Sequence, residues 1–124
     1  MKKIIYTPKA PEPVGPYSQA VEVKGTLYIS GQIAINAETG KIPDGIEAQT
    51  KQVMENIKVI LDAAGYTFNE VVKSTCLLSN MDNFKAMNDI YATYYSENPP
   101  ARAAFQVARL PLDVLVEIET IAVK

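Results

Sequence analysis

The chain has 124 residues, with 12 lysines and arginines against 14 aspartates and glutamates and a net charge of -2 at pH 7. A chain of this size buries about two-thirds of its unfolded surface, so we expect one domain over residues 1–124. The charge balance provides no electrostatic footprint for nucleic acid or an anionic membrane. The opening MKKIIYTPKAPEP has an apolar run too short for a signal sequence, and no stretch could span a bilayer. We therefore expect a cytoplasmic protein without nucleic-acid or membrane partners.

Histidine is absent, and Cys76 is the single cysteine. This composition excludes an internal disulfide, histidine-dependent catalytic triads and histidine-based zinc or iron sites. Any chemistry must come from Glu, Asp, Tyr, Arg, Lys, hydroxyl groups or the backbone.

The first half of the chain predicts a hairpin followed by a helix. Residues 8–16 (PKAPEPVGP) are an ordered loop or extended edge, because proline cannot donate to a strand ladder. Residues 18–23 and 26–31 form a hairpin through the two-residue turn Lys24-Gly25. Residues 36–45 are a loop. Apolar residues at helical spacing predict a helix over 46–64, which ends at Gly65.

The second half predicts a strand, a helix and two further strands. Residues 71–79 are apolar and β-branched, as in a central strand. Asn80 or Asp82 caps the next helix, whose apolar stripe comprises Phe84, Met87, Tyr91, Tyr94 and Tyr95. Together with the last two strands this order is ββαβαββ, an α+β domain with both helices on one face of the sheet. The other face needs covering, which favours a homo-oligomer.

The last two predicted strands, 101–109 and 114–123, flank a turn at Leu110-Pro111-Leu112-Asp113. A hairpin folded at this turn places the guanidinium of Arg102 opposite the carboxylate of Glu117. A cation beside small alanines, with a carboxylate across from it, suits a pocket for a small anion.

Each candidate residue has a structural alternative to a functional role. Arg102 is either a surface or interface ion pair or a bidentate clamp for a carboxylate. Glu117 is either the ionic partner of Arg102 or, if burial raises its pKa, a base or water orienter. Tyr17 by itself is best interpreted as a half-buried aromatic plug.

Four more positions carry the same ambiguity. Ser30-Gly31 either ends a strand or leaves backbone N–H groups open to a ligand. Asn88, on the stripe of the second helix, is structural unless it lines a site. Cys76 lies mid-strand, where a buried inert thiol is favoured over a nucleophile.

Together and in this order, several motifs resemble one family. They are GPYSQ (15–19), SGQI (30–33), the helix end AAG, the strand VVKSTCLL, and PARxxxxVARLPxDVxVEIExIA near the end of the chain. The set resembles the Rid family of reactive-intermediate deaminases over essentially the whole chain. The resemblance implies a chorismate-mutase-like fold, a homotrimer whose three sheets form an inner barrel, and active sites in clefts between subunits. It also implies hydrolysis of 2-iminopropanoate and 2-iminobutanoate to the keto acid and ammonia, without cofactor or metal.

The resemblance assigns a role to each matching position. Arg102 corresponds to the carboxylate clamp and Glu117 to the acidic residue that positions water, and the cleft is lined by Tyr17, Ser30, Gly31 and Asn88. The chain departs at Ala103-Ala104, where archetypal members have a small hydroxyl residue and then cysteine. A backbone contact at Ala104 would survive this change, but a side-chain contribution would not. The alanines could also widen the pocket for longer substrate side chains.

Two other functions stay open at this stage. The first is a non-catalytic module that binds a keto acid or a small amine-derived metabolite through the same cleft. The second comes from relatives described as translation inhibitors or ribonucleases, and the absence of a basic stripe disfavours it.

Overall fold

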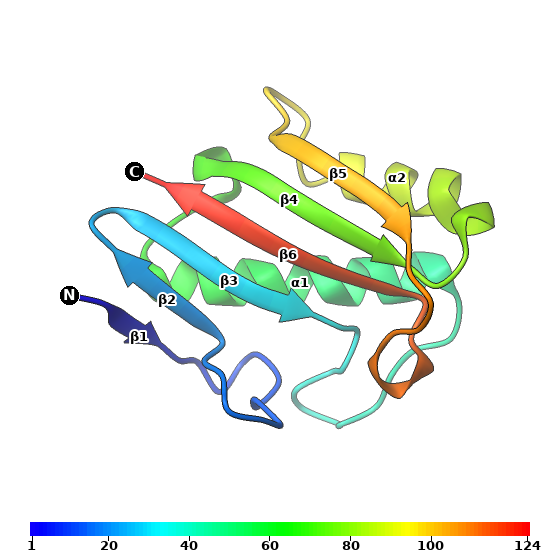
Figure 1. Cartoon of the computed structure of the whole chain (residues 1–124), viewed down its shortest axis with the longest axis horizontal. Helices are drawn as coiled ribbons and strands as arrows, with labels where there is room; N and C mark the ends of the chain where they lie inside the picture. Colours follow the sequence, from blue (N-terminus) through cyan, green and yellow to red (C-terminus); the bar gives the residue numbers. More distant parts are fainter.

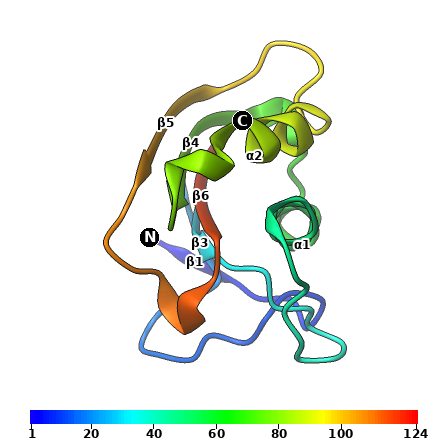
Figure 2. The ribbon, with the colours of Figure 1, turned by 90° about the vertical axis from the view of Figure 1, so that its right-hand side faces the viewer.

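Six strands form one mixed sheet, and two helices cover one of its faces in the computed structural model, which describes residues 1–124 (Figure 1). Figure 2 shows α1 and α2 on the same side of the sheet. The strand order across the sheet is β1-β2-β3-β6-β4-β5. This arrangement confirms the α+β class and the placement of both helices on one face. Neither helix combines the length and apolar composition that crossing a bilayer would require.

The predicted N-terminal hairpin is confirmed as β2 (Ala20–Val23) and β3 (Thr26–Gln32). Its turn residues Lys24 and Gly25 have φ angles of 49° and 81°, as a two-residue turn with right-handed strand twist requires. A short strand that the sequence did not predict, β1 (Lys3–Ile5), pairs with β2 at the edge of the sheet. The element order is therefore βββαβαββ, one strand longer than expected.

Helix α1 spans Ile46–Ala64, the predicted range, and ends where Gly65 adopts the left-handed conformation at φ 80°. Its buried stripe packs on the sheet, with Val53, Ile57 and Ile60 fully excluded from solvent. The hydrophobic stripe therefore decides which face of the helix meets the sheet.

Strand β4 (Val71–Leu78) follows the prediction. Helix α2 (Phe84–Ala92) is confirmed with two corrections: neither Asn80 nor Asp82 caps it, and Tyr94 and Tyr95 lie beyond its end. A single 3-10 turn, Met81–Asn83, separates them, and the Asn80 side chain caps that turn by accepting a hydrogen bond from the Asp82 N–H. The helix then returns the chain to β5 (Ala101–Gln106), which runs parallel to β4 at the sheet edge.

The predicted hairpin between the last two strands is wrong. Strand β6 (Val116–Val123) pairs antiparallel with β3 and β4 in the middle of the sheet, and β5 pairs with β4 alone. The connection between them contains a 3-10 turn, Pro111–Asp113, rather than a tight hairpin turn. Insertion between β3 and β4 gives β6 ladder partners on both edges, which satisfies its backbone N–H and C=O groups in the middle of the sheet.

The second face of the sheet is not covered by any element of the chain (Figure 2). Three large apolar side chains on this uncovered face are about half exposed: Tyr28 (49%), Phe105 (48%) and Val123 (44%). An exposed apolar face of this kind usually meets a partner.

Candidate active site

Arg102 lies in a cleft of about 470 Å³ that we name the arginine cleft, lined by Asn88, Tyr91, Ala92, Tyr95, Pro99, Pro100 and Arg102. The Arg102 Nη1 donates a 2.7 Å hydrogen bond to Asn88 Oδ1. The guanidinium carbon lies 5.0 Å from the centroid of the Tyr91 ring and 5.5 Å from that of Phe84. These contacts hold a cation in one orientation.

No carboxylate neutralises this arginine. The two ion pairs of the structure are Lys85–Asp89 and Arg109–Asp113, both on the surface. The remaining N–H donors of Arg102 are therefore available to an anion, and the fork of a guanidinium matches a carboxylate in two parallel hydrogen bonds.

The helix face that meets Arg102 follows from sequence spacing. Phe84, Asn88 and Tyr91 are four and three positions apart in α2, so they share one side of the helix. The sequence analysis placed these residues on one stripe but missed their contact with Arg102. The spacing of these residues in α2 predicts that they share one face. Their contact with Arg102 follows only once β5 is known to pair in parallel with β4.

A second cleft, of about 440 Å³, contains four of the other predicted residues. We name it the glutamate cleft, lined by Val14, Tyr17, Ser30, Gly31, Ile33, Pro111, Glu117 and Glu119. The register of β3 against β6 shifts between Ile29 and Gln32, so Ser30 and Gly31 form an irregularity beside β6. The Ser30 Oγ donates a 2.6 Å hydrogen bond to the Ser18 carbonyl, which ties the GPYSQ loop to this point.

Glu117 is half-buried in the glutamate cleft and has no hydrogen-bonded or ionic partner in the chain. Burial raises the pKa of its carboxyl above the ordinary value of 4.5, and the nearby Glu119 raises it further. A carboxylate with a raised pKa is a better proton acceptor than an exposed one.

Gly31 makes room for this carboxylate. A Cβ atom at position 31 would lie 2.2 Å from Glu117 Oε2 and 2.9 Å from its Cδ. Any other residue at position 31 would therefore displace the Glu117 side chain.

The two clefts open on opposite faces of the sheet. Arg102 pairs with Ser74 of β4, and Glu117 pairs with Leu77, three positions along the same strand. Because side chains alternate between faces, an odd separation places Arg102 on the helix-covered face and Glu117 on the uncovered face. The prediction that Arg102 lies opposite Glu117 within one chain is therefore wrong.

The predicted site residues thus divide into two groups. Asn88 joins Arg102 directly, and Ala104 lies on the same face of β5, two residues further on. Tyr17, Ser30 and Gly31 lie with Glu117 in the glutamate cleft. No group of three or more Cys, Asp or Glu side chains could hold a metal ion.

Comparison with known proteins identifies the family. The model of the endoribonuclease L-PSP family matches residues 7–124. The chain belongs to this family.

A RutC family protein of Pyrococcus horikoshii is 54% identical over 125 residues, covering 100% of the chain and 99% of that protein. A mouse protein named 2-iminobutanoate/2-iminopropanoate deaminase is 50% identical, covering 100% of the chain and 93% of its own length. The crystal structure of RidA from a Psychrobacter species has a TM-score of 0.96 at 48% identity, covering 98% of the chain and 99% of that structure. The resemblance to Rid proteins is therefore confirmed.

This member of the endoribonuclease L-PSP family has alanine at positions 103 and 104, where the family resemblance implies a hydroxyl residue and a cysteine. Its single cysteine lies on the neighbouring strand instead. Ala104 pairs with Cys76 of β4, whose thiol is fully buried. Burial raises the pKa of Cys76 to about 11, and nearby Arg102 offsets this only in part. The thiol is therefore protonated at neutral pH and shielded from solvent, as expected for an inert side chain.

We expect Cys76→Ala to keep the activity of this family member, because a protonated, solvent-excluded thiol cannot act as a nucleophile. The truncation leaves a small cavity and should cost about 1 kcal/mol of unfolding free energy. Hydrolysis of the imines that the resemblance to Rid proteins implies as substrates measures the first effect in parent and variant, and thermal denaturation measures the second. Loss of turnover in a folded variant would show that the thiol takes part in the reaction.

Gly31→Ala should lower kcat at least about tenfold with little loss of stability. The added Cβ meets the end of a flexible side chain, so Glu117 rotates away and the fold adjusts. Steady-state kinetics and thermal denaturation separate the two outcomes.

The matched control is Gly40→Ala. A Cβ at Gly40 meets nothing within 4 Å, and the residue lies in a loop outside both clefts. Its φ of 74° makes alanine cost about 1 kcal/mol in stability. We expect this variant to be less stable yet fully active, the reverse of Gly31→Ala. Equal kinetic effects in both would contradict a special role for Gly31.

Proposed function

We propose that this protein hydrolyses reactive 2-imino acids, such as 2-iminopropanoate and 2-iminobutanoate, to the 2-keto acid and ammonia. The observation that carries the proposal is an arginine without an anionic partner, held rigidly by Asn88 and two aromatic rings. Such a cation suits the carboxylate that every 2-imino acid carries. The deaminase name of the 50% identical mouse protein supports this choice of substrate.

In the proposed reaction Arg102 binds the substrate carboxylate, while backbone groups near Gly31 and Ala104 hold the imine. Glu117 orients a water molecule and accepts one of its protons as the oxygen bonds to the imine carbon. The electron pair of the C=N bond moves to nitrogen, which takes up a proton, and a carbinolamine results. That intermediate then loses ammonia, and its hydroxyl becomes the keto oxygen.

The side chains and one water balance the reaction, so no cofactor is needed. Orientation and a partly desolvated site supply most of the acceleration.

The proposal requires a second copy of the chain, because Arg102 and Glu117 face opposite sides of the sheet. Packing the uncovered face of one copy against the β5 edge of the next brings Arg102 of the neighbouring copy to Glu117. The exposed side chains Tyr28, Phe105 and Val123 supply apolar surface for this contact. We propose a homotrimer, a closed ring in which each copy contributes to two sites.

This arrangement predicts light scattering at three times 13.6 kDa and complementation between two inactive variants. Refolded together in equal amounts, Arg102→Lys and Glu117→Gln chains produce one intact site in every mixed trimer, or about a quarter of the parental activity. Each variant refolded alone is the control. A stable monomer, or a mixture as inactive as its components, would contradict sites shared between copies.

Nucleic-acid cleavage is the alternative that the family description raises. A bound strand needs a row of cations along its phosphates, and Arg102 is the one cation that lines the arginine cleft. The glutamate cleft has no lysine or arginine. The geometry therefore supports a substrate with one carboxylate.

Measured turnover distinguishes the enzyme from a metabolite-binding module. We expect imine generated in situ by an amino-acid oxidase to disappear faster with the protein present. Binding of 2-oxobutanoate without any acceleration of imine decay would indicate a keto-acid-binding module instead.

A further inference from the structure

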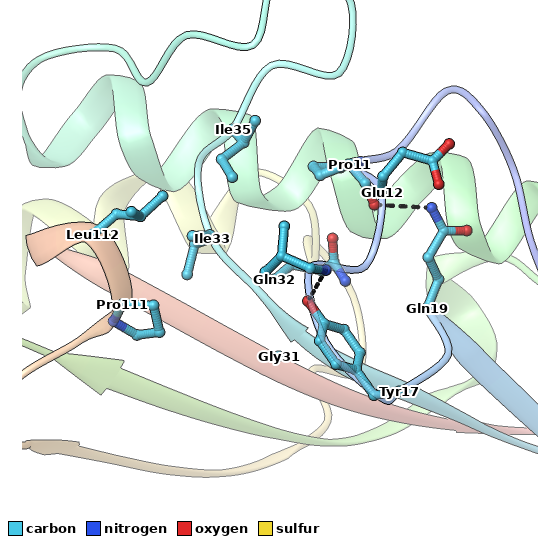
Figure 3. Close-up of a pocket in the computed structure, with 11 residues that line it drawn as sticks. Pro11, Glu12, Tyr17, Gln19, Gly31, Gln32, Ile33, Ile35, Pro111 and Leu112 are labelled. Carbon is cyan, nitrogen blue, oxygen red and sulfur yellow. Dashed lines mark hydrogen bonds between the residues drawn. The ribbon is translucent and has the colours of Figure 1, made fainter.

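An apolar recess of about 300 Å³ adjoins the glutamate cleft and was not recognised in the sequence. It lies between the loop that carries Pro11 and Tyr17 and the turn at Pro111 and Leu112 (Figure 3). Ile33 and Ile35, on the segment that leaves β3, lie between these two walls in Figure 3. The volume is at the lower end of small-molecule pockets, which hold about 300–1,000 Å³.

The recess and the glutamate cleft are continuous. Five residues line both: Val14, Tyr17, Gly31, Ile33 and Pro111. Gly31 is also the residue over which the Glu117 carboxylate lies. One small molecule can therefore place a substituent in the recess while its reacting atom lies beside Glu117, only a few bonds away.

The polar groups around the recess are already engaged inside the chain. The Gln19 amide donates to the carbonyl oxygens of Thr7 and Pro11, both at 3.0 Å, and accepts from the Thr7 N–H at 2.8 Å. The Glu12 carboxylate accepts a hydrogen bond from the Tyr6 hydroxyl. No lysine or arginine lines the recess. It therefore suits a hydrocarbon group, and an anion would be unfavourable there.

Leu112 is held in this wall by a strained backbone. Its φ and ψ are 56° and 20°, in the left-handed region, while 69% of the residue's surface stays exposed. A non-glycine residue in this conformation costs about 1–2 kcal/mol. A largely exposed leucine in a strained backbone conformation is typical of a residue that contacts a ligand.

We propose that this recess binds the side chain of the substrate and makes aliphatic 2-imino acids with long or branched side chains, such as those derived from leucine or methionine, better substrates than the alanine-derived imine. The inference rests on the proposed function and specifies its substrate. An imine carbon has three substituents: the nitrogen, the carboxylate and the side chain. The carboxylate requires a cation, which the recess lacks, and the nitrogen must be reprotonated and released. The side chain is the substituent that an apolar recess can accommodate.

The test compares kcat/KM for leucine-derived and alanine-derived imines, both generated by an amino-acid oxidase. We expect the parent to favour the leucine-derived imine about tenfold or more, because each methylene placed in an apolar pocket contributes about 10-fold or more. Ile35→Trp fills the recess without touching the glutamate cleft, and it should reduce this preference at least tenfold. Leu112→Gly removes the side chain and relieves the strain, so the same loss of preference is expected in a protein that is no less stable.

Ile4→Ala is the control, since Ile4 is 53% exposed on edge strand β1 and lines neither cleft nor recess. We expect it to keep the parental preference. Equal turnover of both imines by the parent, or an unchanged preference in both recess variants, would overturn the recess assignment and leave the proposed function intact. Absence of turnover on every imine would overturn the proposed function and, with it, the assignment of the recess to a substrate side chain.

Discussion

Arg102→Lys is expected to lower kcat/KM for imine hydrolysis by about 100-fold while the proposed trimer stays intact. Lysine keeps the positive charge but has no planar fork, so it cannot make two parallel hydrogen bonds to a carboxylate. It also loses the geometry of the parent site. The guanidinium of Arg102 donates to Asn88 at 2.7 Å and lies 5.0 Å from the Tyr91 ring centroid. An ammonium group on a flexible stem has no equivalent way to be fixed there.

Arg109→Lys is the matched control. Arg109 is exposed, pairs with Asp113 on the surface, and lines neither cleft. Steady-state kinetics on a 2-iminopropanoate substrate should be unchanged by this substitution, and size exclusion with light scattering should give one mass for the parent and both variants. Parental kinetics in Arg102→Lys would show that this residue does not clamp the carboxylate.

Glu117→Gln is expected to lower kcat about 100-fold or more, because the amide cannot accept a proton from water. Binding of 2-oxobutanoate should change only slightly, since the carboxylate of the keto acid binds Arg102 of the neighbouring copy in the proposed site. Glu38→Gln, in an exposed loop, is the control for loss of a carboxylate. Unchanged turnover in Glu117→Gln would exclude the carboxylate as the proton acceptor.

The pH dependence provides a second measurement of the same residue. The pKa of Glu117 is raised, first by burial and then by Glu119. The active carboxylate form is therefore lost as the pH falls through a value above the ordinary 4.5. We expect an acid limb in the profile of kcat/KM that Glu117→Gln removes. Glu119→Gln should move that limb to lower pH, because it removes one of the charges that disfavours the ionised form.

The stability of Glu117→Gln separates catalysis from structure. A carboxyl whose pKa is raised on folding opposes the fold when ionised, so its charge lowers the free energy of unfolding at a pH above that raised pKa. The glutamine variant should therefore be at least as stable as the parent at that pH. A structural ion-pair partner would show the opposite, a loss of stability, and no cation pairs with Glu117 in the folded chain. A side chain that lowers the stability of the fold is typical of a functional site.

The local structure was largely predictable because its signals are local. Helix 46–64 was predicted with its boundaries, since an apolar stripe and a glycine at the C-terminal end both depend on neighbouring residues alone. The Lys24-Gly25 turn and the strand that begins at Val71 follow from the same kind of signal. Six residues of the two clefts were also named in advance, through motifs that resemble a known family: Tyr17, Ser30, Gly31, Asn88, Arg102 and Glu117.

Strand pairing was the part that only the tertiary structure decided. Alternation within a strand places Glu117 and Glu119 on one face, but it does not specify which strand lies alongside. The ladder that inserts β6 between β3 and β4 joins residues far apart in the chain. For this reason Arg102 and Glu117, expected to face each other, lie on opposite faces. The rings around Arg102 and the recess beside Gly31 are likewise formed by segments that meet only in the folded sheet, and no periodicity along the chain records such contacts.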